Sequence, residues 1–292
     1  IGYTAAQVGV EQLLTAVPGL QALAGGALVA EQVAQIDSKD MDGEVWRTLA
    51  LRCAHHLNDS EVRGVVITHG TDTLEETAWF LHEVLDAAKP VVLTCAMRPA
   101  TALTPDGPQN LLDAVATVLA PGATGVLAVA AGEVHGARHV QKVHPYRVNA
   151  FSSGDAGPLG WVEESVVRWA CNSPVVPVNN VDGAMNNIVS AATWPWVEIV
   201  MNHAGASGRA VDALVREGVQ GLVVACTGNG TIHHDLEAAL VRAQNAGVRV
   251  VRSTRCAEGQ VLPKPGDVLP ASQGLSPVKA RVALMLDLLR MH

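Results

Sequence analysis

The chain has 292 residues, of which 49% are hydrophobic and 16% are charged, and its formal net charge is −8. This length exceeds one typical domain, and the composition provides enough apolar residues for a sizeable core. The acidic balance argues against nucleic acid or an anionic membrane as a partner, and no apolar run is long enough to span a bilayer.

Short apolar runs alternate with segments of helical periodicity along most of the chain. Strands are predicted at residues 27–33, 65–68, 91–95, 126–130, 197–201, 221–226 and 248–252. Helices are predicted at residues 5–17, 43–57, 74–85, 108–119, 207–217, 235–245 and 277–289. Apolar strands that alternate with helices indicate a parallel sheet with both faces covered. We therefore predict an α/β protein with a larger, doubly wound parallel-sheet domain at the N-terminus and a smaller, flavodoxin-like α/β domain at the C-terminus.

The alternation of strands and helices stops between about residues 168 and 196. Prolines, an asparagine-rich stretch and the Trp194-Pro195-Trp196 sequence are typical of a connection between domains. We predict an N-terminal domain at 1–170, a connection at 171–193 and a C-terminal domain at 194–292.

Residues 66–81 join a predicted strand to a predicted helix through a turn rich in hydroxyl groups. Gly70, Thr71 and Asp72 lie at the carboxyl end of the strand and at the positive end of the helix, where open α/β sheets bind ligands. A threonine hydroxyl becomes a nucleophile only when a base lies within hydrogen-bond reach. A helix cap is the other reading of the same three residues.

Two more loops carry polar groups beyond predicted strands. Cys95-Ala-Met-Arg-Pro99 follows one strand and precedes Asp106-Gly-Pro108 at a helix start, so it could face the same crevice as Thr71. The segment 136–142 ends in Lys142, which without context would be read as a solvated surface charge.

These three segments together resemble the bacterial L-asparaginases of the asparaginase/glutaminase family, which carry the Thr-Asp turn, an Ala-Met-Arg-Pro run and a Gly-Arg-x-x-x-Lys segment. By this resemblance Lys142 partners Thr71 and Asp72, and a partly buried lysine can act as a base. The resemblance also implies that the backbone carbonyl of Ala96 accepts a hydrogen bond from the substrate amide.

The resemblance assigns roles to two early residues. Tyr3 matches a tyrosine on the family's mobile lid, which closes over the substrate and assists the nucleophile. Ser38 matches the serine that binds the substrate α-carboxylate, while Asp72 would bind the α-ammonium group. A turn residue bonded to its own backbone is the other reading of Ser38. An amino-acid substrate carries both charges, so its site needs a carboxylate and hydrogen-bond donors together.

The Gly-Asn-Gly turn at 228–230 lacks the third glycine of a dinucleotide fingerprint. The family carries the same turn, and its asparagine reaches the active site of a neighbouring subunit. By resemblance Asn229 would do so here, which implies a homo-oligomer with the family's tetramer as the expected form.

We expect no metal and no organic cofactor. His135, His139 and His144 are the only loose cluster among eleven histidines, and no His-Glu-x-x-His motif occurs. The five cysteines are dispersed without a Cys-x-x-Cys pair, which favours buried thiols in a reducing cytoplasm. The periplasm is the alternative compartment.

The sequence departs from the family pattern in two places. The family opens with a strand that ends in Thr-Gly-Gly-Thr, whose first threonine is the usual acylated residue, and the sequence contains no match to it. Loss of that strand would expose an apolar sheet edge, so we expect the polypeptide to extend upstream of Ile1. A glutamate that helps set glutamine use in some relatives has no clear match in residues 260–273.

The expected activity is hydrolysis of L-asparagine to L-aspartate and ammonia through a threonine acyl-enzyme, with minor glutaminase activity. One alternative is an asparaginase-like subunit of a tRNA-dependent amidotransferase, against which the acidic balance argues. Another is an amino-acid-binding module that has lost its nucleophile.

Overall fold

The computed structural model describes residues 9–170 and 183–291. The chain divides into two compact units, Ile1–Met185 and Asn186–His292. Most of the predicted connection at 171–193 lies outside the described residues, but its last part contains helix α6 (Ala184–Ser190). Among the described residues, no helix is both long enough and apolar enough to cross a membrane.

The first unit is built on a six-stranded sheet with the order β1-β2-β3-β4-β7-β8. The first three strands, β1 (Val65–Thr68), β2 (Val91–Thr94) and β3 (Val126–Ala130), are parallel, as predicted. The other three are antiparallel to their neighbours, so the expectation of a wholly parallel sheet was wrong for this half. These strands are β4 (Glu133–Gly136), β7 (Gly160–Glu163) and β8 (Val166–Trp169).

Two tight turns explain the antiparallel half. Ala131 and Gly132 join β3 to β4, and Glu164 and Ser165 join β7 to β8. All four residues have positive φ, which is the backbone of the two-residue turn that connects hairpin strands. A connection of two residues can join only antiparallel neighbours, because a parallel crossover needs a dozen residues or more.

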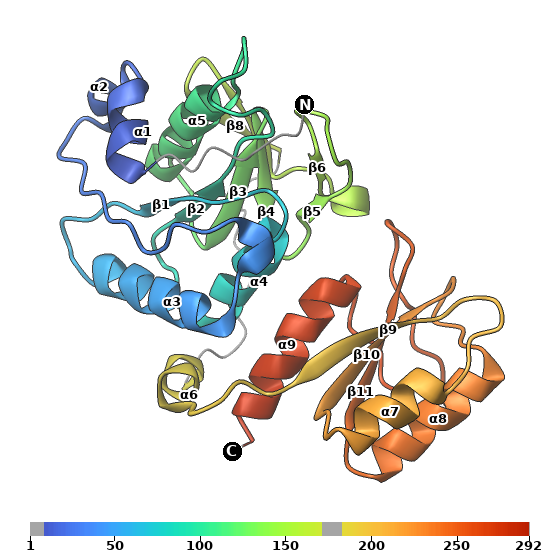
Figure 1. Cartoon of the computed structure of the whole chain (residues 1–292). Coiled ribbons are helices and arrows are strands. Elements are labelled where there is room, and N and C mark those ends of the chain that lie inside the picture. The colour runs from blue at the N-terminus through green and yellow to red at the C-terminus, as the bar shows by residue number, and fades with distance from the viewer. Residues whose placement is uncertain (1–8, 171–182, 292) are drawn as a thin grey trace. The chain divides into compact units, whose positions relative to one another are not determined.

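Helices cover both faces of this sheet. Figure 1 shows α3 (Gly43–Leu57) and α4 (Leu74–Val84) on one face and α5 (Gly107–Leu119) on the other. The short helices α1 (Val10–Ala16) and α2 (Leu20–Ala24) lie beside α5. The strand predicted at 27–33 does not form, and these residues are irregular and mostly exposed. The polar pair Glu31 and Gln32 interrupts the apolar run, and no described strand pairs with it.

A small separate sheet lies next to the main one. It consists of β5 (Gln141–Lys142) and β6 (Phe151–Ser152), which pair antiparallel. Two 3₁₀ turns, η1 (Ser38–Asp40) and η2 (Gly154–Ala156), complete the first unit.

The second unit is a three-layer α/β structure. Its parallel sheet has the order β11-β10-β9, formed by Arg249–Thr254, Gly221–Cys226 and Val197–Met201. Helices α7 (Arg209–Arg216) and α8 (His234–Asn245) cover one face, and α9 (Pro277–Leu289) covers the other (Figure 1). The predicted strands and helices of this region are therefore present, with ends that shift by no more than two residues.

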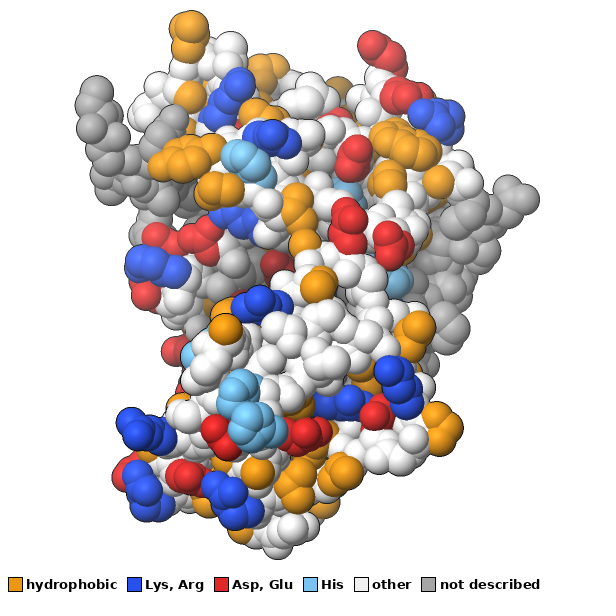
Figure 2. All heavy atoms as spheres, turned by 90° about the vertical axis from the view of Figure 1, so that its right-hand side faces the viewer, with side chains coloured by type: hydrophobic (Ala, Val, Ile, Leu, Met, Phe, Trp, Pro, Cys, Tyr) orange, Lys and Arg blue, Asp and Glu red, His pale blue; other side chains and the backbone are white. Residues whose placement is uncertain are grey.

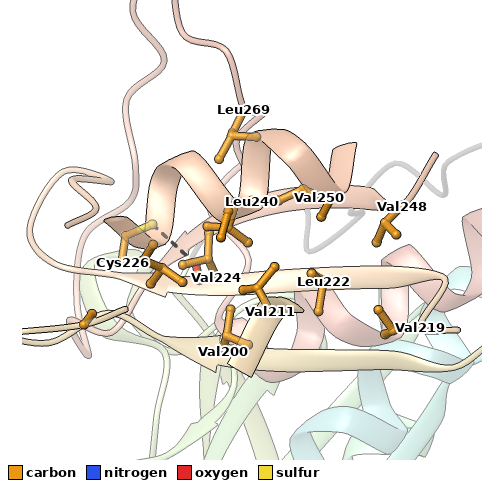
Figure 3. Packing of buried hydrophobic residues seen from close by; sticks show 14 residues of the cluster. Val200, Val211, Val219, Leu222, Val224, Cys226, Leu240, Val248, Val250 and Leu269 are labelled. Atoms are coloured by element: carbon orange, nitrogen blue, oxygen red, sulfur yellow. Dashed lines mark hydrogen bonds between the residues drawn. The ribbon is translucent and has the colours of Figure 1, made fainter. Parts of the chain in front are cut away.

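The core of the second unit lies between its sheet and the α7–α8 layer. Figure 3 shows Leu222 and Val224 of β10 pointing toward Leu240 of α8 and Val211 of α7. All four side chains are fully buried. In contrast to this apolar core, the face of the molecule in Figure 2 carries interspersed acidic and basic side chains.

We predict that Leu222→Ala destabilises the protein by about 2–5 kcal/mol, because the lost methyl groups leave a cavity in a packed core. The midpoint of urea unfolding, followed by circular dichroism, measures this change. The control is Leu262→Ala, whose side chain is 60% exposed and should shift the midpoint little. Equal shifts for the two variants would contradict the assigned core.

Candidate active site

Two loops open at the same edge of the first sheet. Strands β1 and β2 are parallel and in register, with Thr68 opposite Thr94. The ladder continues one step, because the N–H of His69 donates to the carbonyl of Thr94 at 2.8 Å. The loop that carries Gly70, Thr71 and Asp72 therefore begins beside the loop that carries Ala96, as the predicted crevice requires.

Lys142 joins the small sheet to the Thr-Asp turn. Its Nζ donates to Thr71 Oγ1 at 2.8 Å and to Asp72 Oδ1 at 2.5 Å. The Lys142 side chain is only 15% exposed, whereas that of Asp72 is 55% exposed. The backbone N–H of Lys142 donates to the Glu75 carboxylate of α4 at 3.2 Å. A hydroxyl, an amine and a carboxylate thus lie within one hydrogen-bonded group, and Lys142 also lines a surface pocket with residues 143–145.

Asp72 keeps one oxygen for other partners. Its Oδ1 accepts from Lys142 and, at 3.4 Å, from the Thr71 hydroxyl. Its Oδ2 accepts no hydrogen bond from any residue that the structure describes. The hydrogen bond from Lys142 lowers the pKa of Asp72 and outweighs the partial burial that would raise it. The carboxylate is therefore charged and available to a cation.

Ser38 lies beneath the Thr-Asp turn. Its hydroxyl oxygen accepts the Asp72 N–H at 3.2 Å, and its carbonyl accepts the Thr73 hydroxyl at 2.7 Å. Ser38 is buried, and its hydroxyl hydrogen has no acceptor among the described residues. Gly70 packs so closely on Ser38 that an added Cβ would lie 2.7 Å from the Ser38 Cβ.

The Ala96 loop is held by two side chains at the start of α5. Asp106 accepts the backbone N–H groups of Met97 and Arg98, each at 2.9 Å. Asn110 donates to the Cys95 carbonyl at 2.9 Å. A peptide N–H and the carbonyl of the same peptide point in opposite directions, so the bond from Met97 turns the Ala96 carbonyl away from Asp106. Ala96 itself is exposed.

Burial makes the thiol of Cys95 unreactive. Desolvation raises the pKa of its thiol to about 12, with the Asp106 charge acting in the same direction and Lys142 opposing it. The described cysteines Cys53, Cys95, Cys226 and Cys256 are all free thiols.

The remaining predicted residues lie elsewhere. Tyr3 is outside the described residues. Asn229 belongs to the second unit, where its side-chain oxygen accepts the Leu262 N–H at 2.7 Å. Its contact with a neighbouring subunit stays a prediction.

The loose histidine cluster does not form a shared set of metal ligands. His135 instead pairs with Ser153 at 2.9 Å, and the only described group close enough to hold an ion is His233, His234 and Asp235. That trio lies at the start of α8, where the positive end of the helix disfavours a cation.

Sequence reasoning missed three supporting residues: Glu75, Asn110 and His69. Glu75 is one of two acidic residues in the first turn of α4, a common pattern at helix starts that indicates no contact with Lys142. Asn110 was detectable, because a polar amide lies there on the apolar face of a predicted helix. His69 is a single residue at a strand end and carried no signal of its own.

Known proteins resemble this chain along nearly its whole length. The family model "Asparaginase, N-terminal" matches residues 2–174, and "Glutaminase/Asparaginase C-terminal domain" matches residues 196–291. "L-asparaginase 2" of Escherichia coli is 38% identical over 294 residues, which cover 98% of this chain and 82% of that protein. "Glutaminase-asparaginase" of Pseudomonas fluorescens is 36% identical, with coverages of 98% and 80%.

A solved structure is also similar. The crystal structure of a probable cytoplasmic L-asparaginase from Campylobacter jejuni matches with a TM-score of 0.89 at 38% identity. The match covers 98% of this chain and 92% of that chain. The two-domain α/β fold predicted from the sequence is thereby confirmed.

We predict that Gly70→Ala destabilises the protein by about 1–3 kcal/mol, because its methyl group would overlap Ser38. The loss should shrink in the Ser38→Gly background, where the overlap is relieved, and urea unfolding of the four proteins measures the coupling. Gly26→Ala is the control, since no atom lies within 4 Å of its added Cβ. Additive effects of the two substitutions would contradict the contact.

We predict that Lys142→Met raises the pKa of Asp72 toward its ordinary value of 3.8. A depressed carboxylate pKa adds stability that is present above the ordinary value and lost as pH falls through the folded-state value. As pH falls through the pKa of Asp72, the free energy of unfolding of the variant should therefore decrease less than that of the wild type. Carboxyl ¹³C NMR measures the titration, and Lys39→Met is the control because Lys39 is the weakest contributor. An unchanged Asp72 midpoint in Lys142→Met would rule out the pairing.

Proposed function

The chain belongs to the asparaginase family, and on that premise we propose that it hydrolyses the side-chain amide of L-asparagine to L-aspartate and ammonia. L-Glutamine is proposed as a minor substrate, because one relative is named for both activities. The observation that carries the proposal is the contact of Lys142 Nζ with Thr71 Oγ1 and Asp72 Oδ1.

The site suits a zwitterionic amino acid. Asp72 Oδ2 is uncommitted among the described residues and can accept the substrate α-ammonium group. The Ser38 hydroxyl, which already accepts from Asp72, has a hydrogen left to donate to the α-carboxylate. The carbonyl of Ala96, an exposed residue, can accept from the side-chain amide. Opposite charges on one ligand are thus met by one carboxylate and by hydrogen-bond donors.

The chemistry begins with a proton transfer. Among the described residues, Thr71 Oγ1 is the hydroxyl placed to attack the amide carbon. In the proposed reacting state Lys142 has first released a proton to solvent, so that the Thr71 proton can move to Lys142 Nζ, 2.8 Å away. The ammonium group that forms is stabilised by Asp72. The negative charge that develops on the amide oxygen is met by backbone N–H groups of the Gly70–Thr71 turn.

The intermediate then separates in two steps. The carbon–nitrogen bond breaks, and ammonia leaves with the proton that Lys142 returns. The aspartyl ester on the threonine is then attacked by water, which passes a proton to Lys142. Lys142 returns this proton to Thr71 Oγ1 as the ester bond breaks, and L-aspartate is released. Side-chain and backbone groups carry every step, so the proposed mechanism uses no metal and no organic cofactor.

We further propose that the protein acts as a homotetramer in which Asn229 of one subunit serves the site of another. The turn at 228–230 is rigidly braced, because Arg252 donates to the Gly230 carbonyl at 3.3 Å and pairs with Asp267. The oxygen of Asn229 accepts from Leu262, and its NH₂ group, which donates to no residue that the structure describes, can donate to a carboxylate. Tyr3 is proposed to assist the nucleophile from the lid. The free thiols favour the cytoplasm as the compartment.

The direct test is ammonia release from L-asparagine and from L-glutamine by the purified protein, measured side by side. We expect rapid release from L-asparagine and slower release from L-glutamine. Release from neither amide by folded protein would overturn the proposed function and favour a binding module.

Thr71→Ala should lower kcat by at least about a thousandfold while the protein stays folded, because no other group would occupy the position of Oγ1. Thr48→Ala is the matched control, since Thr48 is exposed on α3 and its hydroxyl bonds, within the described part of the chain, only to the Glu44 carbonyl of the same helix. Near-normal turnover by Thr71→Ala would remove Thr71 from the mechanism.

A further inference from the structure

We propose that Trp46, Thr77 and His69 form a hydrogen-bond relay, buried at its Trp46 end, that orients the Thr71 N–H as the oxyanion donor. This inference rests on the proposed amidohydrolase function and assigns His69 as a positioning residue for it. The relay links α3, α4 and the loop after β1, so it is built from three separate elements of the first unit.

The relay consists of three consecutive hydrogen bonds. Trp46 Nε1 donates to Thr77 Oγ1 at 2.9 Å. Thr77 Oγ1 lies 3.0 Å from His69 Nε2, and His69 Nδ1 lies 2.7 Å from the Gly70 carbonyl oxygen. Trp46 and Thr77 are buried, so water does not compete for the bond between them. The bond between Thr77 and His69 is partly buried, and the bond between His69 and the Gly70 carbonyl is exposed.

Elementary valence fixes the direction of each bond. A carbonyl oxygen only accepts, so His69 Nδ1 must carry a hydrogen. Burial lowers the pKa of His69 and outweighs the opposing hydrogen bond to Gly70, so the ring is neutral and Nε2 is an acceptor. Thr77 therefore donates its hydroxyl hydrogen to His69 and accepts from Trp46. The donor and acceptor roles of all three side chains are therefore fixed.

The last bond determines where the Thr71 N–H points. The Gly70 carbonyl and the Thr71 N–H belong to one planar peptide, and the described chain contains no cis bond. The carbonyl and the N–H of this peptide point in opposite directions. The hydrogen bond from His69 to the Gly70 carbonyl therefore also fixes the direction of the Thr71 N–H. The Thr71 N–H donates to no described residue, which leaves it available to a substrate oxygen.

The same bond strengthens the donor. A hydrogen bond to the carbonyl draws electron density from the amide, so its N–H becomes a better donor to a developing negative charge. The rigid partners keep this geometry, because the Trp46 ring stacks on Phe80 of α4 with centroids 5.0 Å apart. A donor fixed before the reaction stabilises the transition state without reorganisation.

One test measures the tautomer of the His69 ring and does not depend on enzymatic activity. In protein labelled with ¹⁵N-histidine, the ring nitrogens of His69 are assigned by comparison with His69→Gln. We expect a neutral ring with hydrogen on Nδ1 in the wild type, and a mixture of tautomers in Thr77→Val. A ring with hydrogen on Nε2, or a charged ring near neutral pH, would overturn the relay.

A second test measures its effect on catalysis. We expect Thr77→Val to lower kcat for L-asparagine by about tenfold to a hundredfold with little change in KM, because an oxyanion donor acts mainly in the transition state. Thr77→Ser keeps the hydroxyl and should restore most of kcat. The matched control is Thr117→Val, since Thr77 and Thr117 are both 0% exposed and, among the described residues, the Thr117 hydroxyl bonds only to the Asp113 carbonyl of its own helix.

The outcomes separate the relay from the proposed function. Equal kcat losses in Thr77→Val and Thr117→Val, or no loss in either, would overturn the positioning role. If the wild type releases no ammonia while His69 carries its hydrogen on Nδ1, the hydrogen-bond chain stands and the proposed function, with the oxyanion role that depends on it, falls.

Discussion

The candidate site depends on one cation that joins two parts of the first unit. Lys142 comes from the small β5–β6 sheet, whereas Thr71 and Asp72 come from the loop between β1 and α4, 71 and 70 residues away in sequence. Because the lysine side chain is mostly buried, the adjacent carboxylate offsets the cost of burying its charge, and the hydrogen bond from the lysine lowers the pKa of Asp72. This pairing holds Lys142 Nζ against the Thr71 hydroxyl, where the proposed proton transfer requires it.

The surrounding residues act mainly by fixing peptide planes. Asp106 holds the Met97 N–H and so turns the Ala96 carbonyl outward, while His69 holds the Gly70 carbonyl and so turns the Thr71 N–H outward. One loop thus presents an acceptor and the neighbouring loop presents a donor at the same sheet edge. An amide substrate offers the complementary pair, an N–H and an oxygen. Rigid placement of such groups contributes more to catalysis than their number.

The sequence predicted regular elements well and irregular ones poorly. Helix α3, strand β10 and helix α9 have the predicted ends, because their periodicity or apolar runs stop at clear boundaries. The hairpins at Ala131 and Ser165 were missed, because neither turn carries Asn-Gly or Asp-Gly, the usual signal. Thr71 and Asp72 follow from their place at a strand end, whereas Lys142 was found only by resemblance, since a two-residue strand leaves no pattern. The role of His69 could not be predicted from the sequence, because it depends on the direction of one hydrogen bond in the folded protein.

The most direct test of the Thr71–Lys142 assembly is a double-mutant cycle on kcat for L-asparagine. The four proteins are the wild type, Thr71→Val, Lys142→Met and the double variant, with slow turnover followed by long incubation. If Lys142 acts through Thr71 Oγ1, the double variant should be no slower than the slower single variant. Independent action would instead multiply the two losses, and that result would contradict the shared proton transfer on which the proposed mechanism depends.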